Sequence, residues 1–136
     1  MAPPCPPCSG PTVNTLAKLR DLVEQKTGVR YNFVLVNRYK DGEEKIGDHK
    51  DGEKELAKDV AIASLTLGAE RDFIFKHQDR RNNSVENVKL LLKDGMLLLM
   101  NHPTNTFWYH GLPPRKGCHQ PRINLTFRRI KNNHQL

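Results

Sequence analysis

Residues 121–129 read PRINLTFRR, and this stretch indicates the fold. Successive side chains of a strand point to opposite faces, so this segment has one apolar face and one polar face. The apolar face holds Ile123, Leu125 and Phe127, and the polar face holds Arg122, Asn124, Thr126 and Arg128. In an antiparallel sheet such a polar face is usually solvated. We therefore expect a strand over 122–130 with an outer, solvated polar face.

The chain before this strand indicates one helix followed by many short strands. Apolar residues recur at three-to-four spacing over 12–27, and Gly28 is a plausible helix stop. Strands are predicted at 31–39, 61–67, 71–77, 88–92, 96–100 and 106–110, with a loop at 78–84. The polar, charged segment 40–55 is expected to be a loop or to lie near an edge. Gly68-Ala69 and Lys93-Asp94-Gly95 are expected as tight turns between strands. The pattern predicts a mainly β protein, a sandwich or barrel with one N-terminal helix.

The length and charge of the chain limit the number of domains and the kinds of partner that it can have. The chain has 136 residues, which suits one domain, and a net charge of +7. No acidic residue follows Asp94, and six basic residues do: Arg115, Lys116, Arg122, Arg128, Arg129 and Lys131. A basic C-terminal third favours an anionic partner, whether a nucleic acid, an acidic surface or a carboxylate ligand, although solubility alone would also explain it.

Other features exclude several classes of protein. No apolar run is long enough to span a membrane, and the N-terminus lacks the pattern of a secretory signal. The three cysteines do not form a disulfide framework and fit a reducing compartment. Cys5 and Cys8 have CxxC spacing, but their Pro-rich surroundings favour no metal or redox role. We expect residues 1–11 to be a disordered lead-in, 12–131 the folded core and 132–136 a tail.

The histidines suggest a metal centre. His49 and Asp51 are separated by one residue, so an extended segment places both on one side and offers two ligands to one ion. His110, at the end of a predicted strand, is the candidate third ligand. A 2-His-1-carboxylate face leaves open positions and favours non-haem Fe(II) used for oxygen chemistry. A 2-oxo dicarboxylate cosubstrate also needs a cation at its far end, and Arg122 or Arg128 could bind it with paired hydrogen bonds.

A second polar cluster lies on the predicted strand 31–39. Asn37 and Tyr39 share a face with Phe33 and Leu35, so polar groups continue an apolar face. This arrangement suggests the polar end of an internal pocket, with solvent exposure at a strand end as the alternative.

These motifs resemble one known family. The resemblance is carried by HxD at 49–51, NHPTNTFWYH at 101–110 and RxNxTxR at 122–128, together with FVLVNRYKDGEEKIGD (33–48) and IASLTLGAERDFIFKH (62–77). In these segments the chain resembles the AlkB family of Fe(II)- and 2-oxoglutarate-dependent nucleic-acid dealkylases. The resemblance covers roughly residues 11–130, and it is strongest to the members that repair double-stranded DNA.

The resemblance implies a fold and a set of roles. The fold would be a double-stranded β-helix, or jelly roll, with the polar face of RxNxTxR turned inward, against the solvated face expected above. Fe(II) would be bound by His49, Asp51 and His110. The 2-oxoglutarate would be bound by Arg122, Tyr39, Arg128, Asn37 and Asn124. Glu53 would contact the damaged base, and Lys76, Arg80, Arg81, Arg115 and Lys116 would contact the DNA backbone.

The implied activity is oxidative DNA repair. The enzyme would use Fe(II), 2-oxoglutarate and O₂ to remove N-methyl groups from 1-methyladenine and 3-methylcytosine in DNA, releasing formaldehyde, succinate and CO₂. Alkylated double-stranded DNA would be the partner of a nuclear monomer, with no membrane involved. The damaged base would flip out of the duplex to reach the metal.

The chain departs from the family at two places. Gly52 replaces the second acid usual after HxD, and only about ten Pro-rich residues stand where the family carries a nucleotide-recognition lid. Either the chain is a shortened isoform or gene model, or it binds its substrate differently. Two alternatives share the same core: a shortened protein that binds iron and 2-oxoglutarate without activity, and an RNA demethylase.

Overall fold

The computed structural model describes residues 11–52 and 54–131, so the predicted lead-in and tail lie outside them, apart from Pro11. The predicted helix is α1 (Pro11–Thr27), and it forms a unit separate from residues 32–136. Gly28 ends α1 with a φ of +70°, and its N–H donates to the carbonyl of Glu24 at 2.8 Å. On the expected apolar stripe Val23 is buried, but Leu22 is 55% exposed. No described helix is both long and apolar enough to cross a membrane.

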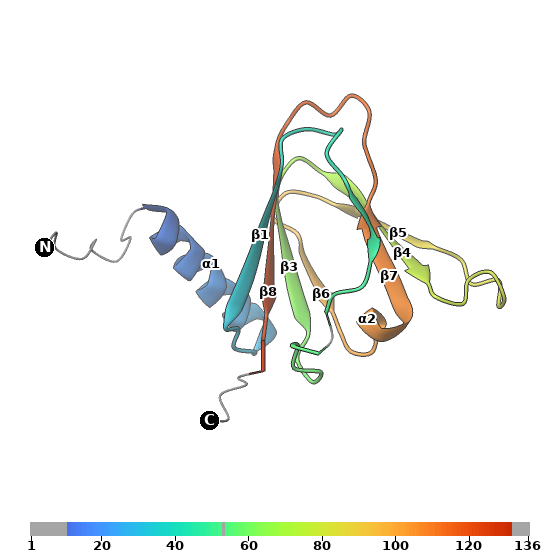
Figure 1. The fold of residues 1–136 in the computed structure, drawn as a ribbon. Coiled ribbons are helices and arrows are strands. Elements are labelled where there is room, and N and C mark those ends of the chain that lie inside the picture. The colour runs from blue at the N-terminus through green and yellow to red at the C-terminus, as the bar shows by residue number, and fades with distance from the viewer. Residues whose placement is uncertain (1–10, 53, 132–136) are drawn as a thin grey trace, which may run out of the picture. The chain divides into compact units, whose positions relative to one another are not determined.

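The β unit consists of two four-stranded antiparallel sheets that face each other (Figure 1). One sheet has the order β1 (Phe33–Tyr39), β8 (Arg122–Arg128), β3 (Ile62–Gly68) and β6 (Leu97–Met100). The other has the order β2 (Ile46–His49), β7 (Trp108–Leu112), β4 (Arg71–His77) and β5 (Val88–Leu92). Consecutive strands such as β1 and β2, or β3 and β4, belong to opposite sheets. Eight strands in this order form a jelly roll, as the resemblance implied.

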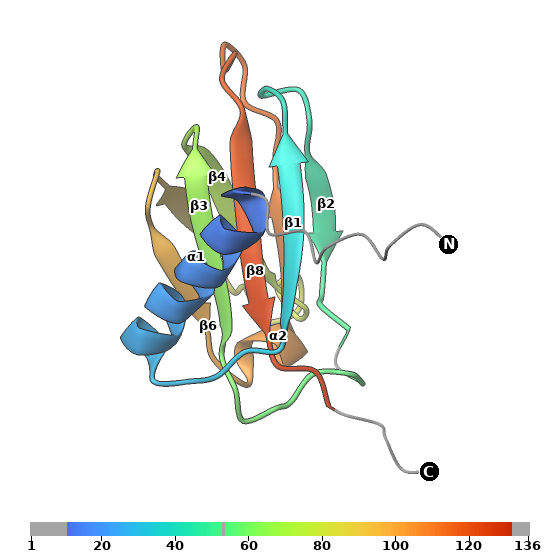
Figure 2. The ribbon, with the colours of Figure 1, turned by 90° about the vertical axis from the view of Figure 1, so that its left-hand side faces the viewer.

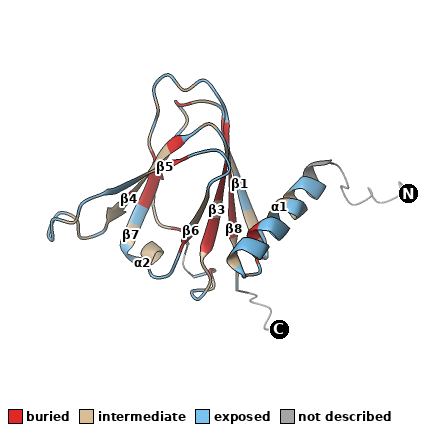
Figure 3. Cartoon of the chain, turned by 180° about the vertical axis from the view of Figure 1, so that it is seen from behind, coloured by how far each residue is buried: buried red, intermediate tan, exposed pale blue. Residues whose placement is uncertain are grey.

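The strand predicted over 122–130 is β8 and lies in the middle of its sheet. β8 pairs with β1 on one side and with β3 on the other, as Figure 2 shows. Burial is concentrated on β3 and β8 (Figure 3). Both faces of β8 are largely buried: Leu125 and Phe127 are each 2% exposed, and Arg122 is 3% exposed. The expectation of a solvated polar face was therefore wrong, and the inward face implied by the resemblance is the one observed.

Most predicted strands and turns are confirmed, with two corrections. β3 and β4 are joined at Gly68, whose φ of +88° requires the conformational freedom of glycine. The segment 40–55, predicted as a loop or as lying near an edge, contains the short edge strand β2. The predicted strand 106–110 is replaced by a short helix, α2 (Thr104–Phe107), followed by β7. Turn hydrogen bonds of the Thr104 and Thr106 N–H groups to the carbonyls of Asn101 and Pro103 start this helix.

A small apolar core lies between the two sheets. Leu56, Ile62, Phe75 and Met100 are buried together, and Phe73, Leu90, Leu98 and Trp108 pack against them. These residues come from both sheets and from the loop before β3. The core therefore packs the two sheets against each other, and polar side chains line the remaining space between them.

Candidate metal centre and cosubstrate cavity

Strand pairing brings the predicted metal ligands together. His49 is the last residue of β2 and is directly opposite His110 on β7. Their ring centroids are 4.4 Å apart. Asp51 follows two residues after His49, and the ligand atoms of all three side chains lie within 4.8 Å of one another. No other described His, Cys, Asp or Glu residues form such a cluster.

The ligand atoms converge on one carboxylate oxygen. Asp51 Oδ1 lies 3.6 Å from His49 Nε2 and 3.4 Å from His110 Nε2. Arg128 places its Nη2 3.3 Å from the same oxygen. Burial opposes ionisation of Asp51, but the hydrogen bond from His110 and the charges of His110, Arg128 and His49 outweigh it, so the pKa of Asp51 is lowered. The carboxylate is therefore held in its charged, metal-binding form.

The donor set fits Fe(II). His49 Nδ1 lies 2.8 Å from the Gly47 carbonyl, which can only accept, so Nδ1–H donates there and Nε2 is the ring nitrogen left to bind a metal. Two imidazole nitrogens and one carboxylate oxygen form a face that leaves other coordination positions open. The residues present therefore suit a 2-His-1-carboxylate iron site.

The three ligands line a cavity of about 350 Å³ between the two sheets. The polar face of β8 also lines it, and two of its four polar residues are opposite predicted cosubstrate residues of β1: Arg122 is opposite Tyr39, and Asn124 is opposite Asn37. Arg122 and Arg128 stand at opposite ends of β8, and Arg128 contacts Asp51. A row of polar side chains thus leads from Arg122 to the metal centre. The interpretation of Asn37 and Tyr39 as the polar end of an internal pocket agrees with this cavity.

Arg122 is a buried cation that no described carboxylate pairs with. It donates to Thr66 Oγ1 at 3.0 Å, its Nε is buried without a partner, and its guanidinium lies 5.6 Å from the Tyr39 ring centroid. Burial lowers the pKa of Arg122, which the nearby Tyr39 opposes and Arg71 reinforces. Burial also raises the pKa of Tyr39, more than Arg122 and Arg71 lower it. A protonated phenol beside an unpaired guanidinium is suited to bind a carboxylate.

Arg71 was not predicted from the sequence as part of this region. It is 1% exposed and donates to the carbonyls of Asp41, Glu44 and Pro113 at 2.8 to 3.2 Å. These bonds fix the segment after Tyr39 against the end of β7. The sequence could have indicated its inward orientation, because Arg71 lies two residues before Phe73 in β4 and therefore on the same inward face.

Asn124 is held by hydrogen bonds within the protein. Its Nδ2 donates to Ser64 Oγ at 2.7 Å and to the Leu65 carbonyl at 3.2 Å, and its Oδ1 accepts from Thr126 Oγ1 at 2.8 Å. Asn124 therefore supports the cavity wall as well as lining it. Asn37 lines the cavity opposite Asn124.

The predicted nucleic-acid contacts fall in separate places. Glu53 lies outside the described residues, although its neighbour Gly52 lines the cavity. Three of the five basic residues already contact protein groups: Lys76 pairs with Asp48 at 2.8 Å, Arg80 donates to the His77 carbonyl, and Arg115 pairs with Glu70. Arg81 and Lys116 are exposed. Lys76 and Arg80 lie at the end of β4, and Arg115 contacts the residue before its start. The structure thus places the five residues in two groups at opposite ends of β4.

Comparison with known proteins identifies relatives of this chain. Residues 2–128 match the model of the 2OG-Fe(II) oxygenase superfamily. The chain is 54% identical to human DNA oxidative demethylase ALKBH2 over 124 residues, which cover 88% of this chain and 48% of that protein. It is 56% identical to mouse ALKBH2, covering 88% of this chain and 52% of that protein. The chain therefore spans about half the length of the curated relatives that it matches.

A solved structure supports the fold. The structure of OsALKBH1 superimposes with a TM-score of 0.58, covering 89% of this chain and 65% of that chain at 22% identity. At this level of identity the likeness concerns the fold alone, and it agrees with the jelly roll described above.

Proposed function

Since this chain belongs to the 2OG-Fe(II) oxygenase superfamily, and within it to the AlkB family, we propose that it is an oxidative DNA dealkylase. The substrate would be DNA carrying 1-methyladenine or 3-methylcytosine, and the cosubstrates would be 2-oxoglutarate and O₂. The observation that supports this proposal best is the convergence of His49, Asp51 and His110 in a cavity that also holds the unpaired Arg122. One cavity thus offers a metal face and a cation for a dicarboxylate.

The metal ligands have separate tasks in this proposal. His49 and His110 would each bind Fe(II) through Nε2, and Asp51 would bind it through its carboxylate. With 2-oxoglutarate and O₂, iron held there would supply the oxidation of the N-methyl group, whose carbon would leave as formaldehyde. Gly47 orients His49, and Arg128 orients Asp51 through the contact at 3.3 Å. The metal face is therefore preorganised by its neighbours.

The polar row of β8 would position 2-oxoglutarate. Arg122 would bind one carboxylate with two parallel N–H donors, and Tyr39 would donate its hydroxyl to the same group. Arg128, Asn37 and Asn124 would face the rest of the cosubstrate. Since Arg122 is buried, this ion pair would be shielded from water and correspondingly strong.

The substrate side of the proposal rests on the family. We propose that Glu53 contacts the exocyclic edge of a flipped, positively charged methylated base. The DNA phosphates would be contacted by five basic residues: Lys76, Arg80, Arg81, Arg115 and Lys116. On binding DNA, Arg80 and Arg115 would either keep their present contacts within the protein or exchange them for phosphates. Phosphate contacts position the duplex and make binding dependent on salt. Double-stranded DNA, a nuclear location and a monomeric state belong to this proposal.

Succinate formation tests the proposal. The chain is incubated with Fe(II), 2-oxoglutarate and a duplex carrying 1-methyladenine, with the unmethylated duplex and Asp51→Asn as controls. We expect succinate to form faster with the methylated duplex and to fall to background in Asp51→Asn. Binding of metal and 2-oxoglutarate without turnover would instead support the inactive alternative, and faster turnover of the same lesion in single-stranded RNA would support the RNA demethylase.

A further inference from the structure

The backbone of the metal ligand Asp51 is held by one side chain from α2. Asn105 Oδ1 accepts from the Asp51 N–H at 2.9 Å, and Asn105 Nδ2 donates to the Asp51 carbonyl at 3.0 Å. The two residues are 54 positions apart in the chain. A primary amide carries a donor and an acceptor on one planar group, so it can satisfy both backbone groups of one residue.

This pairing begins where the β-ladder stops. β2 ends at His49, which is the last residue of that strand paired with β7. Asp51 lies beyond the ladder and is 8% exposed, so without a partner its backbone groups would be poorly satisfied. Asn105 therefore replaces the missing strand partner at the third metal ligand.

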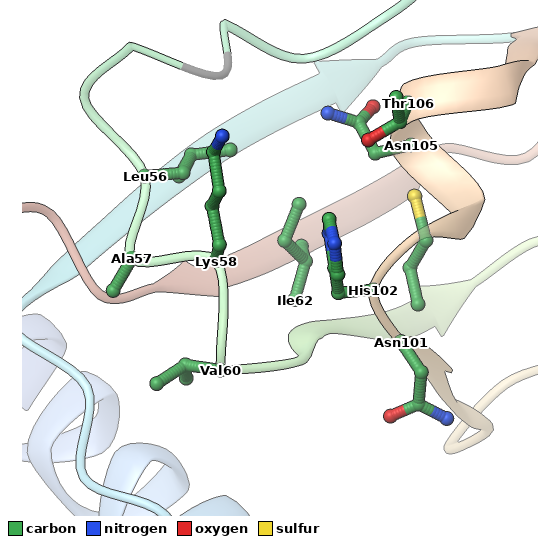
Figure 4. A pocket seen from close by; sticks show the side chains of 10 residues that line it. Leu56, Ala57, Lys58, Val60, Ile62, Asn101, His102, Asn105 and Thr106 are labelled. Carbon is green, nitrogen blue, oxygen red and sulfur yellow. The ribbon is translucent and has the colours of Figure 1, made fainter.

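A second set of contacts holds the same loop. Lys50, between the two ligands, donates from Nζ to the Thr106 carbonyl and to Gln78 Oε1, both at 2.8 Å. Its Nζ also lies 4.9 Å from the Tyr109 ring centroid. Adjacent residues of α2 thus bind adjacent residues of the metal loop. Figure 4 shows Asn105 and Thr106 side by side on this helix, at the edge of a small pocket that they share with Ile62.

We propose that Asn105 is a positioning residue for the metal centre, which fixes the backbone of Asp51 so that its carboxylate meets the two histidines. The inference rests on the metal centre but not on the choice of substrate. Side chains that orient the ligands of a metal typically change its affinity by about 10- to 100-fold when they are lost. Asn105 would act through the ligand's main chain, whereas Arg128 contacts the carboxylate.

Direct metal binding tests this role without a turnover assay. Co(II) is titrated into the full chain under anaerobic conditions, and its Kd and visible absorption are measured for the wild type and Asn105→Ala. Asn101→Ala is the matched control: Asn101 is exposed, lines the same pocket, and its amide points away from Asn105 in Figure 4. We expect the Kd to rise about 10- to 100-fold in Asn105→Ala, with altered Co(II) absorption, and to stay unchanged in Asn101→Ala.

Two further measurements separate positioning from simple loss of folding. Circular dichroism reports whether the metal-free variants are folded, and Asn105→Gln keeps the amide on a longer side chain. We expect Asn105→Gln to bind Co(II) more tightly than Asn105→Ala. A folded Asn105→Ala with wild-type Kd and absorption would overturn the proposal, as would equal weakening in Asn105→Gln and Asn105→Ala. Wild-type Co(II) binding without any demethylation would count against the proposed function alone.

Discussion

Replacing Arg122 with methionine is expected to change cosubstrate affinity and stability in opposite directions. Arg122 is 3% exposed, and its described hydrogen bond is to the neutral Thr66 hydroxyl. Its charge is therefore desolvated without an anionic partner until a carboxylate binds. Replacing a poorly compensated buried ion with an apolar side chain of similar volume is often neutral or stabilising by about 1–4 kcal/mol. For a chain of this length, each kcal/mol corresponds to a rise in Tm of about 3 °C.

The same substitution removes the paired donors for the dicarboxylate. Each hydrogen bond to a charged group contributes about 1.5–3 kcal/mol. Losing two should weaken binding by about 3 kcal/mol or more, which is roughly a 100-fold or greater rise in Kd.

The assay combines two measurements on one variant. Calorimetry with Mn(II) and 2-oxoglutarate gives the Kd, and thermal unfolding of the ligand-free protein gives the Tm. Arg38→Met is the control, because Arg38 is an exposed residue of β1 that alternates with the cavity residues. An unchanged Kd in Arg122→Met would refute the assigned role. A large fall in Tm, with Arg38→Met unaffected, would refute the view that this charge is unpaired.

Three other substitutions test separate parts of the account. Tyr39→Phe should raise the Kd of 2-oxoglutarate by roughly 10-fold or more. Burial raises the pKa of Tyr39, so its hydroxyl keeps its proton at mildly alkaline pH. The Kd ratio between Tyr39→Phe and wild type, measured by calorimetry, should therefore stay constant from about pH 7 to about pH 9. Gly42→Ala should lower the Tm markedly, because a Cβ there would collide with the Arg115 carbonyl. Gly47→Ala should leave the Tm unchanged, because there is open space around Gly47. Equal Tm values for the two variants would contradict this reasoning. Arg71→Lys replaces a planar guanidinium that reaches three carbonyls from two nitrogens with a single nitrogen, and it should cost about 1–3 kcal/mol in urea unfolding. An unchanged midpoint would show that those bonds contribute little.

The strand pattern could be predicted from the sequence, but the side of the sheet that faces inward could not. The alternation of β8 showed which side chains share a face, because it depends only on backbone geometry. It suggested a solvated polar face, yet Arg122 and Asn124 line the cavity. Polarity alone does not distinguish a solvated face from one that lines a polar cavity, and the family resemblance supplied that distinction.

Long-range contacts explain the parts that were missed. The β-forming residues Thr106 and Phe107 favoured a strand, but local turns and the bonds from Asn105 to Asp51 hold the segment as α2. The strand β2 is short and polar, and its pairing with β7 defines it. Propensity within a short window contains no information about partners more than fifty residues away. The close approach of His49, Asp51 and His110 was predictable because HxD and a second histidine form a motif whose chemistry does not depend on the details of packing.

Formaldehyde release from methylated DNA tests the central claim most directly. The chain is mixed with Fe(II), 2-oxoglutarate, O₂ and a duplex carrying 1-methyladenine, and formaldehyde is quantified together with the loss of the methylated base. The account predicts one formaldehyde for each base restored, and none from Asp51→Asn. Absence of formaldehyde from a wild-type chain shown to bind both metal and 2-oxoglutarate would contradict it.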